Sequence, residues 1–315
     1  MQVGESSQAA TLRLSADATD LAGSAFQQTG NRLTVILALA AVYLIWGSTY
    51  LGIRFALEGF PPYMLGALRF LIAGAGLYIF LRMRGMSRPT LVEWQGSALL
   101  GILMLVLGFG GVTFAEQYVS SGLTALAVGA MPLWAALFAG LFGRWPVRVE
   151  LLGLALGFAG LIILNLSGGL SAKPIGAIVL LISPAGWALG SVLSGRLRLP
   201  PGLMGSAAEM LCGGAVMAVI SVVRGERLHH TPSMHATLAL VYLTVFGSIV
   251  AFSAYLFLLG RVRPSLATSY AYVNPIVAMG VGVWLGGEHT SGAALFATPI
   301  ILAGVVIVLV GQQRR

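Results

Sequence analysis

Few residue types that carry enzyme chemistry occur in this sequence of 315 residues, and those few are not grouped for it. No HExxH motif is present, and the paired carboxylates Asp17 and Asp20 lie in a polar N-terminal segment. The sequence therefore supports neither zinc hydrolysis nor paired-carboxylate catalysis. The histidines lie between or beside long apolar runs, where solvated loops are the simplest interpretation: His229, His230, His235 and His289. We expect no catalytic residue, no bound metal and no cofactor.

Charged side chains inside the apolar runs are a stronger signal, because burying a charge in hydrocarbon is costly. Arg69 and Glu209 each lie about seven residues inside a run, or on the order of 10 Å along a helix. Both are candidates for a coupling or a structural role, with Glu209 as the group that could bind a proton, and an ion pair between them requires that their helices be adjacent. Arg54 lies close to the end of its run, where its side chain can reach the membrane surface, so a gating or anchoring role is favoured.

Polar and aromatic residues gather in the middle of two apolar runs, where contact with lipid is unfavourable. They are Trp46, Ser48, Thr49 and Tyr50 in the first, and Ser183, Trp187, Ser191 and Ser194 in the second. We interpret them as candidates for binding a solute. The alternative is local, because serine and threonine hydroxyls also bond to carbonyls of their own helix and small residues allow close packing.

Two later runs are the richest in such residues. Phe252, Tyr270, Tyr272 and Asn274 are predicted to line a cavity, whereas Tyr242 fits the membrane interface. Aromatic faces with a few hydrogen-bonding tips suit amphipathic solutes, including aromatic amino acids.

Two prolines, Pro132 and Pro275, lie in the middle of their runs, where each removes an intrahelical hydrogen bond and favours a kink. A kink is a place where helix halves can flex for gating. A bend fitted only to neighbouring helices is the alternative.

The elements that hold these residues are membrane-spanning helices. The sequence is 57% hydrophobic and only 9% charged, where soluble proteins carry about 25% charged residues. Apolar runs of about 20 residues match the length of a helix across the bilayer and exclude barrel strands of about ten residues. We predict an all-α integral membrane protein, with a disordered tail over 1–30 and ten spans: 33–57, 62–83, 94–115, 119–142, 148–166, 174–195, 203–223, 236–259, 265–286 and 290–311.

Basic residues alternate between the two sides that these spans define. One side receives thirteen: Arg13, Arg32, Arg82, Arg84, Arg88, Arg144, Arg148, Arg196, Arg198, Arg261, Arg263, Arg314 and Arg315. The other receives three: Lys173, Arg224 and Arg227. The positive-inside rule then predicts that both termini are cytoplasmic. The net charge of +8 is explained by this topology rather than by nucleic-acid binding.

An internal repeat relates the two halves of the chain. Residues 120–143 align without gaps with 263–286, matching Pro132 with Pro275 at an offset of 143 residues. The offset recurs for 47–48 against 190–191 and, with one residue inserted, for 160–164 against 304–308. Repeats over 31–170 and 171–313, with five spans each, enter the membrane from opposite sides. Such inverted repeats are typical of secondary transporters.

The motifs resemble the EamA-type exporters of the drug/metabolite transporter superfamily. The resemblance rests on Ile45-Trp46-Gly47-Ser48-Thr49-Tyr50 with Arg54, Pro61-Pro62 and Arg69, and on Trp187, Gly190-Ser191, the stretch 267–275 and Gly286-Gly287-Glu288. It implies ten helices, cytoplasmic termini, and a central cavity lined by spans one, three, four, six, eight and nine.

From these features we expect a bacterial inner-membrane secondary transporter that exports small organic metabolites, amino acids first, by alternating access. The direction of transport comes from the resemblance alone. Efflux of drugs or toxic compounds is the alternative, and a membrane enzyme or a channel is a remote one. No GxxxxGK[ST] loop is present, which disfavours an ATP-driven pump and leaves a gradient or passive transport. The expected partners are the solute and the lipid bilayer, with no nucleic acid, and the chain is expected to act as a monomer.

Overall fold

The computed structural model describes residues 32–143, 145–166, 174–259, 261–262, 269–288 and 292–313. Over these residues the chain is helical and contains no strand, which confirms the all-α prediction. Six described helices are long and apolar enough to cross a membrane: Arg32–Ala56, Pro62–Met83, Leu91–Ala115, Ser121–Leu141, Leu203–Val223 and Met234–Tyr255. Shorter apolar helical segments are Ile178–Ser194, Val273–Trp284 and Leu295–Val308. The predicted tail 1–30 lies outside the described residues.

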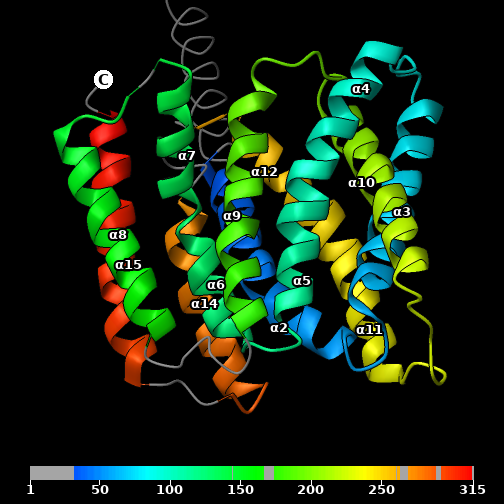
Figure 1. The fold of residues 1–315 in the computed structure, drawn as a ribbon. Coiled ribbons are helices and arrows are strands. Elements are labelled where there is room, and N and C mark those ends of the chain that lie inside the picture. Colours follow the sequence, from blue (N-terminus) through cyan, green and yellow to red (C-terminus); the bar gives the residue numbers. More distant parts are fainter. Residues whose placement is uncertain are drawn as a thin grey trace, which may run out of the picture.

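The elements follow one another as a bundle of roughly parallel and antiparallel helices (Figure 1). In order they are η1 (Val42–Trp46), α2 (Gly47–Ala56), α3 (Pro62–Met83), α4 (Leu91–Leu100), η2 (Gly101–Gly110), α5 (Gly111–Ala115), α6 (Ser121–Gly129), α7 (Met131–Leu141), α8 (Arg148–Leu166), α9 (Pro174–Ser194), α10 (Leu203–Val223), α11 (Met234–Tyr242), η3 (Leu243–Val250), α12 (Ala251–Leu259), α14 (Tyr270–Trp284) and α15 (Gly292–Gln313).

Local sequence signals set several helix ends. Thr90 and Glu93 form a capping box at the start of α4, and Pro62 occupies the first turn of α3, where a missing N–H costs nothing. After α14, Gly287 has a φ of +60°, a conformation that residues with a side chain rarely adopt. That turn directs the next residue, Glu288, back toward the bundle.

Helix pairs that pack closely form the two edges of the bundle in Figure 1, α3 with α10 and α8 with α15. Glycines permit the close approach. A Cβ added to Gly304 in α15 would lie 2.5 Å from the backbone nitrogen of Gly157 in α8, and one added to Gly160 would lie 2.7 Å from Ile301. Between the α3 and α10 backbones, a Cβ on Gly74 would lie 2.9 Å from Met210.

Three helical rods change to π-helix in their middle, at η1, η2 and η3. A π-helix is a wider turn that leaves the regular hydrogen-bond pattern, and such segments occur frequently at functional sites. All three face the interior of the bundle, where each contributes residues to one cavity.

The two candidate kink prolines lie in different settings. The helical rod that carries Pro132 is interrupted at Ala130, between α6 and α7, and Pro132 then lies in the first turn of α7. Pro275 lies inside α14, which continues through it.

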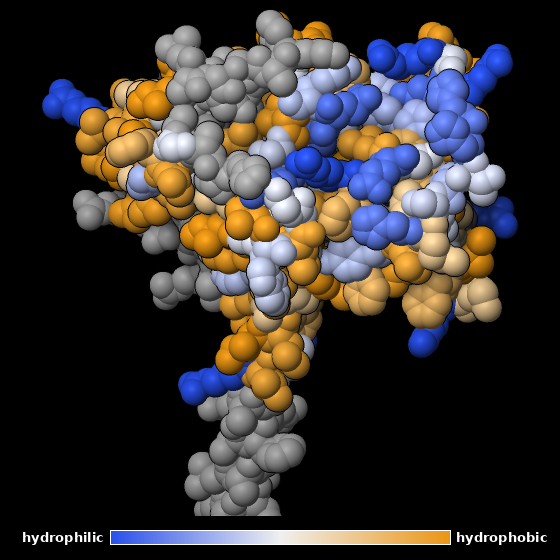
Figure 2. Space-filling view, turned by 90° about the horizontal axis from the view of Figure 1, so that it is seen from below, coloured by the Kyte–Doolittle hydropathy of each residue, from blue (hydrophilic) through white to orange (hydrophobic). Residues whose placement is uncertain are grey.

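Large apolar side chains point outward along the helices. Met83, Val223 and Trp284 are 82%, 80% and 85% exposed, a pattern that suits lipid rather than water. Seen from the end of the bundle where α2, α5 and α14 terminate, hydrophilic residues gather on part of the face, and apolar residues lie beside them and along the flank (Figure 2). The described part of the chain therefore has the surface of a membrane-embedded bundle.

Candidate functional site

A cavity lies in the centre of the bundle, and the residues that line it come from η1, α2, α3, η2, α5, α6, α7, α9, α10, η3, α12 and α14. It brings together eight of the predicted solute-binding residues: Trp46, Thr49, Tyr50, Ser183, Trp187, Phe252, Tyr270 and Asn274. These residues come from chain segments more than 200 positions apart, so only the folded bundle joins them.

Aromatic rings form much of one wall. The indole of Trp46 lies 5.0 Å from the ring of Tyr270 and 6.3 Å from that of Phe252, in edge-to-face arrangements that favour aromatic pairs. The indole N–H of Trp46 donates to the carbonyl of Gly247 at 3.1 Å. That bond holds η1 against η3 at the cavity wall.

Three predicted residues do not line the cavity: Ser48, Ser191 and Ser194. The hydroxyl of Ser48 donates to the carbonyl of Leu44 at 2.6 Å and contacts the hydroxyl of Tyr242 at 2.7 Å. The hydroxyl of Ser191 donates to the Trp187 carbonyl at 2.9 Å. The hydroxyl of Ser194 donates to the Ser191 carbonyl at 2.7 Å. All three therefore follow the local alternative, in which a serine bonds back to its own helix. Tyr272 belongs to α14, but its side chain lies outside the described ones.

Arg69 and Glu209 both line the same cavity, on the neighbouring helices α3 and α10. Their helices are thus adjacent, yet no ion pair joins the two side chains. Arg69 is 4% exposed, and its Nε donates to the hydroxyl of Ser248 at 2.7 Å. The guanidinium lies 4.2 Å from the ring centre of Phe109 and 5.1 Å from that of Phe70, which is cation–π geometry.

Sequence reasoning missed two of the residues that position Arg69. Phe109 lies in a long apolar run, where nothing separates a cavity-lining ring from a packed one. Gly247 leaves the space that the guanidinium occupies, since a Cβ there would lie 2.9 Å from Nη2. Neither role has a local sequence signal, because both depend on how η2 and η3 pack against α3.

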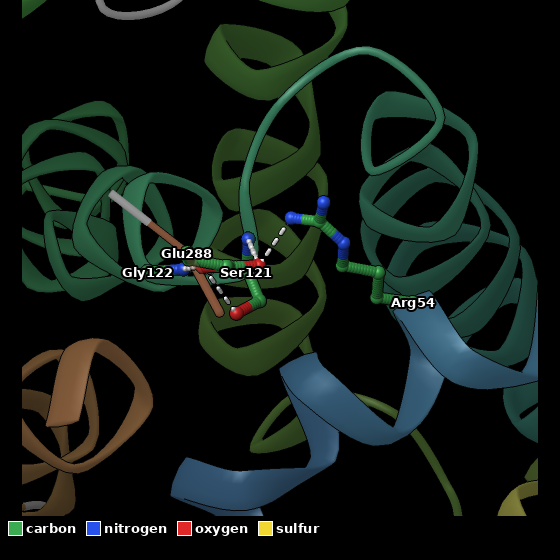
Figure 3. Close-up of polar contacts among 4 residues, drawn as sticks. All are labelled: Arg54, Ser121, Gly122 and Glu288. Atoms are coloured by element: carbon green, nitrogen blue, oxygen red, sulfur yellow. Dashed lines mark hydrogen bonds and ion pairs between the residues drawn. The ribbon is translucent and has the colours of Figure 1, made fainter. Parts of the chain in front are cut away.

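A second group of polar residues lies where α2, α5 and α14 end. Arg54 on α2 forms an ion pair with Glu288, and the carboxylate of Glu288 also accepts from Ser121 and Gly122 at the start of α6 (Figure 3). The Ser121 N–H and hydroxyl lie 3.0 and 2.9 Å from the carboxylate oxygens. A helix N-terminus favours a negative charge, so Glu288 closes the end of α6.

Glu116, which follows α5, borders the same group. It is 6% exposed, and neither carboxylate oxygen has a hydrogen-bond partner. Burial raises the pKa of the Glu116 carboxyl well above its usual value, and the nearby carboxylate of Glu288 raises it further, whereas the guanidinium of Arg54 opposes the shift. This carboxyl is therefore poised to hold a proton.

A bundle of apolar helices around an interior cavity, with charged and aromatic residues directed inward, is the arrangement expected of a multi-pass membrane transporter. Comparison with known proteins agrees: the model of the EamA-like transporter family matches this chain twice, over residues 33–166 and 174–310. The chain belongs to the EamA-like transporter family.

Relatives in several organisms carry transporter names. The chain is 47% identical over 276 residues to an inner membrane transporter of Escherichia coli (strain K12) named YedA, covering 87% of this chain and 90% of that one. It is 27% identical to the transporter YdfC of Bacillus subtilis, covering 83% and 86% of the two chains. A solved crystal structure superposes with a TM-score of 0.63 over 90% of this chain and 99% of the other at 23% identity, which shows a common fold.

Proposed function

We propose that the protein is a secondary transporter that exports small organic metabolites across the bacterial inner membrane, with aromatic or hydrophobic amino acids as the first candidates. The observation that carries this proposal is the central cavity, which has aromatic walls and a few polar groups, as sites for small organic solutes commonly do. An amphipathic solute can place its apolar part against Trp46 and Phe252 and its polar part toward Arg69 or Asn274.

Ten spans in two inverted repeats provide the mechanism. The two matched segments, 33–166 and 174–310, support a division near residue 170. Contacts between α8 and α15 are reciprocal in the way that a repeat predicts, because Gly160 meets Ile301 while Gly304 meets Gly157, and an offset of 144 residues exchanges the two pairs. Related halves of opposite orientation can exchange inward-open and outward-open states around one central cavity.

The distribution of arginines supports cytoplasmic termini, and on that basis the Arg54–Glu288 contact lies at the outer end. Arg54 and its neighbours at the start of α6 belong to the first matched segment, whereas Glu288 belongs to the second. Opening the outer end by separating the halves would break this contact. Arg54 therefore serves as part of an outer gate. The break before Pro132, and the hydrogen bond that Pro275 removes inside α14, are the places where these helices can flex.

The test is reconstitution of the purified protein into liposomes loaded with a labelled amino-acid panel, followed by release with and without a pH gradient. Release of amino acids above the level of protein-free liposomes supports the proposal. Efflux of cationic dyes with no amino-acid release would favour the alternative, a multidrug or toxic-compound exporter. If release responds to the pH gradient, the same measurement on Glu209→Gln shows whether Glu209 takes part in the coupling.

A further inference from the structure

Arg69 is a buried cation whose own fold leaves it incompletely paired. Its side chain is 4% exposed, and among the described residues no carboxylate lies within ion-pair distance of it. The Nη1 nitrogen is buried without a hydrogen-bond partner. A buried charge without a counter-ion is costly, and a buried donor without an acceptor adds to that cost. Such a group is suited to a ligand that supplies the missing acceptor.

The surrounding residues fix the guanidinium instead of neutralising it. Ser248 accepts from Nε, and the rings of Phe70 and Phe109 lie against the guanidinium. The missing side chain at Gly247 gives Nη2 its space, and the bond from Trp46 holds the Gly247 carbonyl in place. Because these contacts leave Nη1 without an acceptor, the arginine is prepared for an anion at the cavity.

Glu209 places a carboxyl group on the same cavity. It is partly exposed, on α10, and it pairs with no cation among the described residues. Antiparallel contacts place Gly66 of α3 beside Met217 and Gly74 beside Met210, so Arg69 and Glu209 are offset by about six residues along the bundle. At 1.5 Å per residue this is about 9 Å between backbone levels, a gap that the two long side chains and a small solute can fill together.

We propose that Arg69 binds the carboxylate of the transported solute and that Glu209 binds its ammonium group, with the solute's side chain against the aromatic wall. This inference rests on the proposed transport through the cavity. It defines the solute as a zwitterion with an apolar side chain. Uncharged or purely cationic compounds lack the carboxylate that Arg69 requires.

The experiment measures competition in proteoliposomes that exchange labelled phenylalanine. The competitors are unlabelled phenylalanine, phenylalaninamide, which lacks the carboxylate, and 3-phenylpropionate, which lacks the amine. For the wild type we expect phenylalanine to compete at least 10-fold better than either analogue. In Arg69→Gln the advantage over the amide should disappear while the amide itself still competes, which also shows that the variant is folded.

Further variants separate charge from geometry. Arg69→Lys keeps the charge without the planar fork and should restore part of the preference for the carboxylate. Glu209→Gln should remove the preference for phenylalanine over 3-phenylpropionate. Arg84→Gln, at the exposed end of the same helix, is the matched control and should resemble the wild type. If phenylalanine keeps its wild-type advantage over phenylalaninamide as a competitor in Arg69→Gln, this inference is overturned while the proposed function stands. Failure of the wild type to exchange phenylalanine or any other amino acid overturns the proposed function together with it.

Discussion

Replacement of Glu288 by glutamine should open the outer end of the bundle. The change keeps the size of the side chain and removes its charge. In the structure the carboxylate accepts from the Ser121 N–H at 3.0 Å, the Ser121 hydroxyl at 2.9 Å and the Gly122 N–H at 3.4 Å, and it pairs with Arg54. These contacts join the two matched segments of the chain, so the proposed gate requires that they break when this end opens.

The size of the effect follows from these contacts. A hydrogen bond to a charged group contributes about 1.5–3 kcal/mol, and a carboxylate at a helix N-terminus adds about 0.3–1 kcal/mol. The amide of glutamine retains one acceptor oxygen, so part of this is kept. We expect a net loss of about 3 kcal/mol from the closed state, which raises the ratio of open to closed molecules on the order of 100-fold. The side chain of Arg54 is 43% exposed, so its ion pair contributes less. Arg54→Gln should therefore cost the closed state about 1 kcal/mol and raise the ratio of open to closed molecules about 5-fold.

The assay is the rate at which a membrane-impermeant maleimide labels a cysteine in the cavity from outside. Cys212, the single cysteine of the chain, is first replaced by serine, and Ile53→Cys then places a thiol in the cavity wall. Glu58→Gln is the matched control, since Glu58 lies at the same end and its side chain is 56% exposed. We expect the fastest labelling in Glu288→Gln, slower labelling in Arg54→Gln and the slowest in Glu58→Gln. Equal rates in all three folded variants would refute the gating role.

Three further predictions concern stability, proton binding and the solute site. Gly304→Ala forces a Cβ to within 2.5 Å of the α8 backbone, so it should destabilise the bundle by about 1–3 kcal/mol in thermal melts, whereas Gly76→Ala, with open space around it, should not. Because the pKa of Glu116 is raised, the folded state holds a proton that the unfolded chain releases above pH 4.5. The stability of the wild type should therefore fall as pH rises from there. Glu116→Gln should melt at least about 2 °C higher than the wild type at pH 8, and its melting temperature should depend less on pH. Gly247→Ala should displace the Arg69 guanidinium and weaken solute competition several-fold at nearly unchanged melting temperature, and wild-type competition would contradict the placement of that group.

The helices are largely predictable from sequence because hydrophobicity and length determine them. The ranges predicted as 62–83 and 203–223 coincide with α3 and α10. Local chemistry is harder to rank: Ser48 and Trp46 carry equal signals in sequence, but only Trp46 lines the cavity, because the hydroxyl of Ser48 finds an acceptor one turn back in its own helix.

Contacts between segments far apart in the chain are not predictable from this sequence. The sequence marks Arg69 and Glu209 as unusual charges, yet their common cavity depends on the packing of α3 against α10. The Glu288 contact depends on a turn at Gly287 that returns the chain to α6, 167 positions earlier. Tertiary packing, not local propensity, creates both sites.

Exchange in proteoliposomes, measured as efflux of label stimulated by external solute, tests alternating access through the cavity most directly. Liposomes loaded with a labelled amino acid are diluted into buffer with or without the same unlabelled amino acid. Alternating access predicts that the unlabelled solute outside accelerates release of the label, and that Val128→Trp, which fills the cavity wall, abolishes the acceleration. Release at the same rate with and without external solute would contradict it and would indicate a continuous pore.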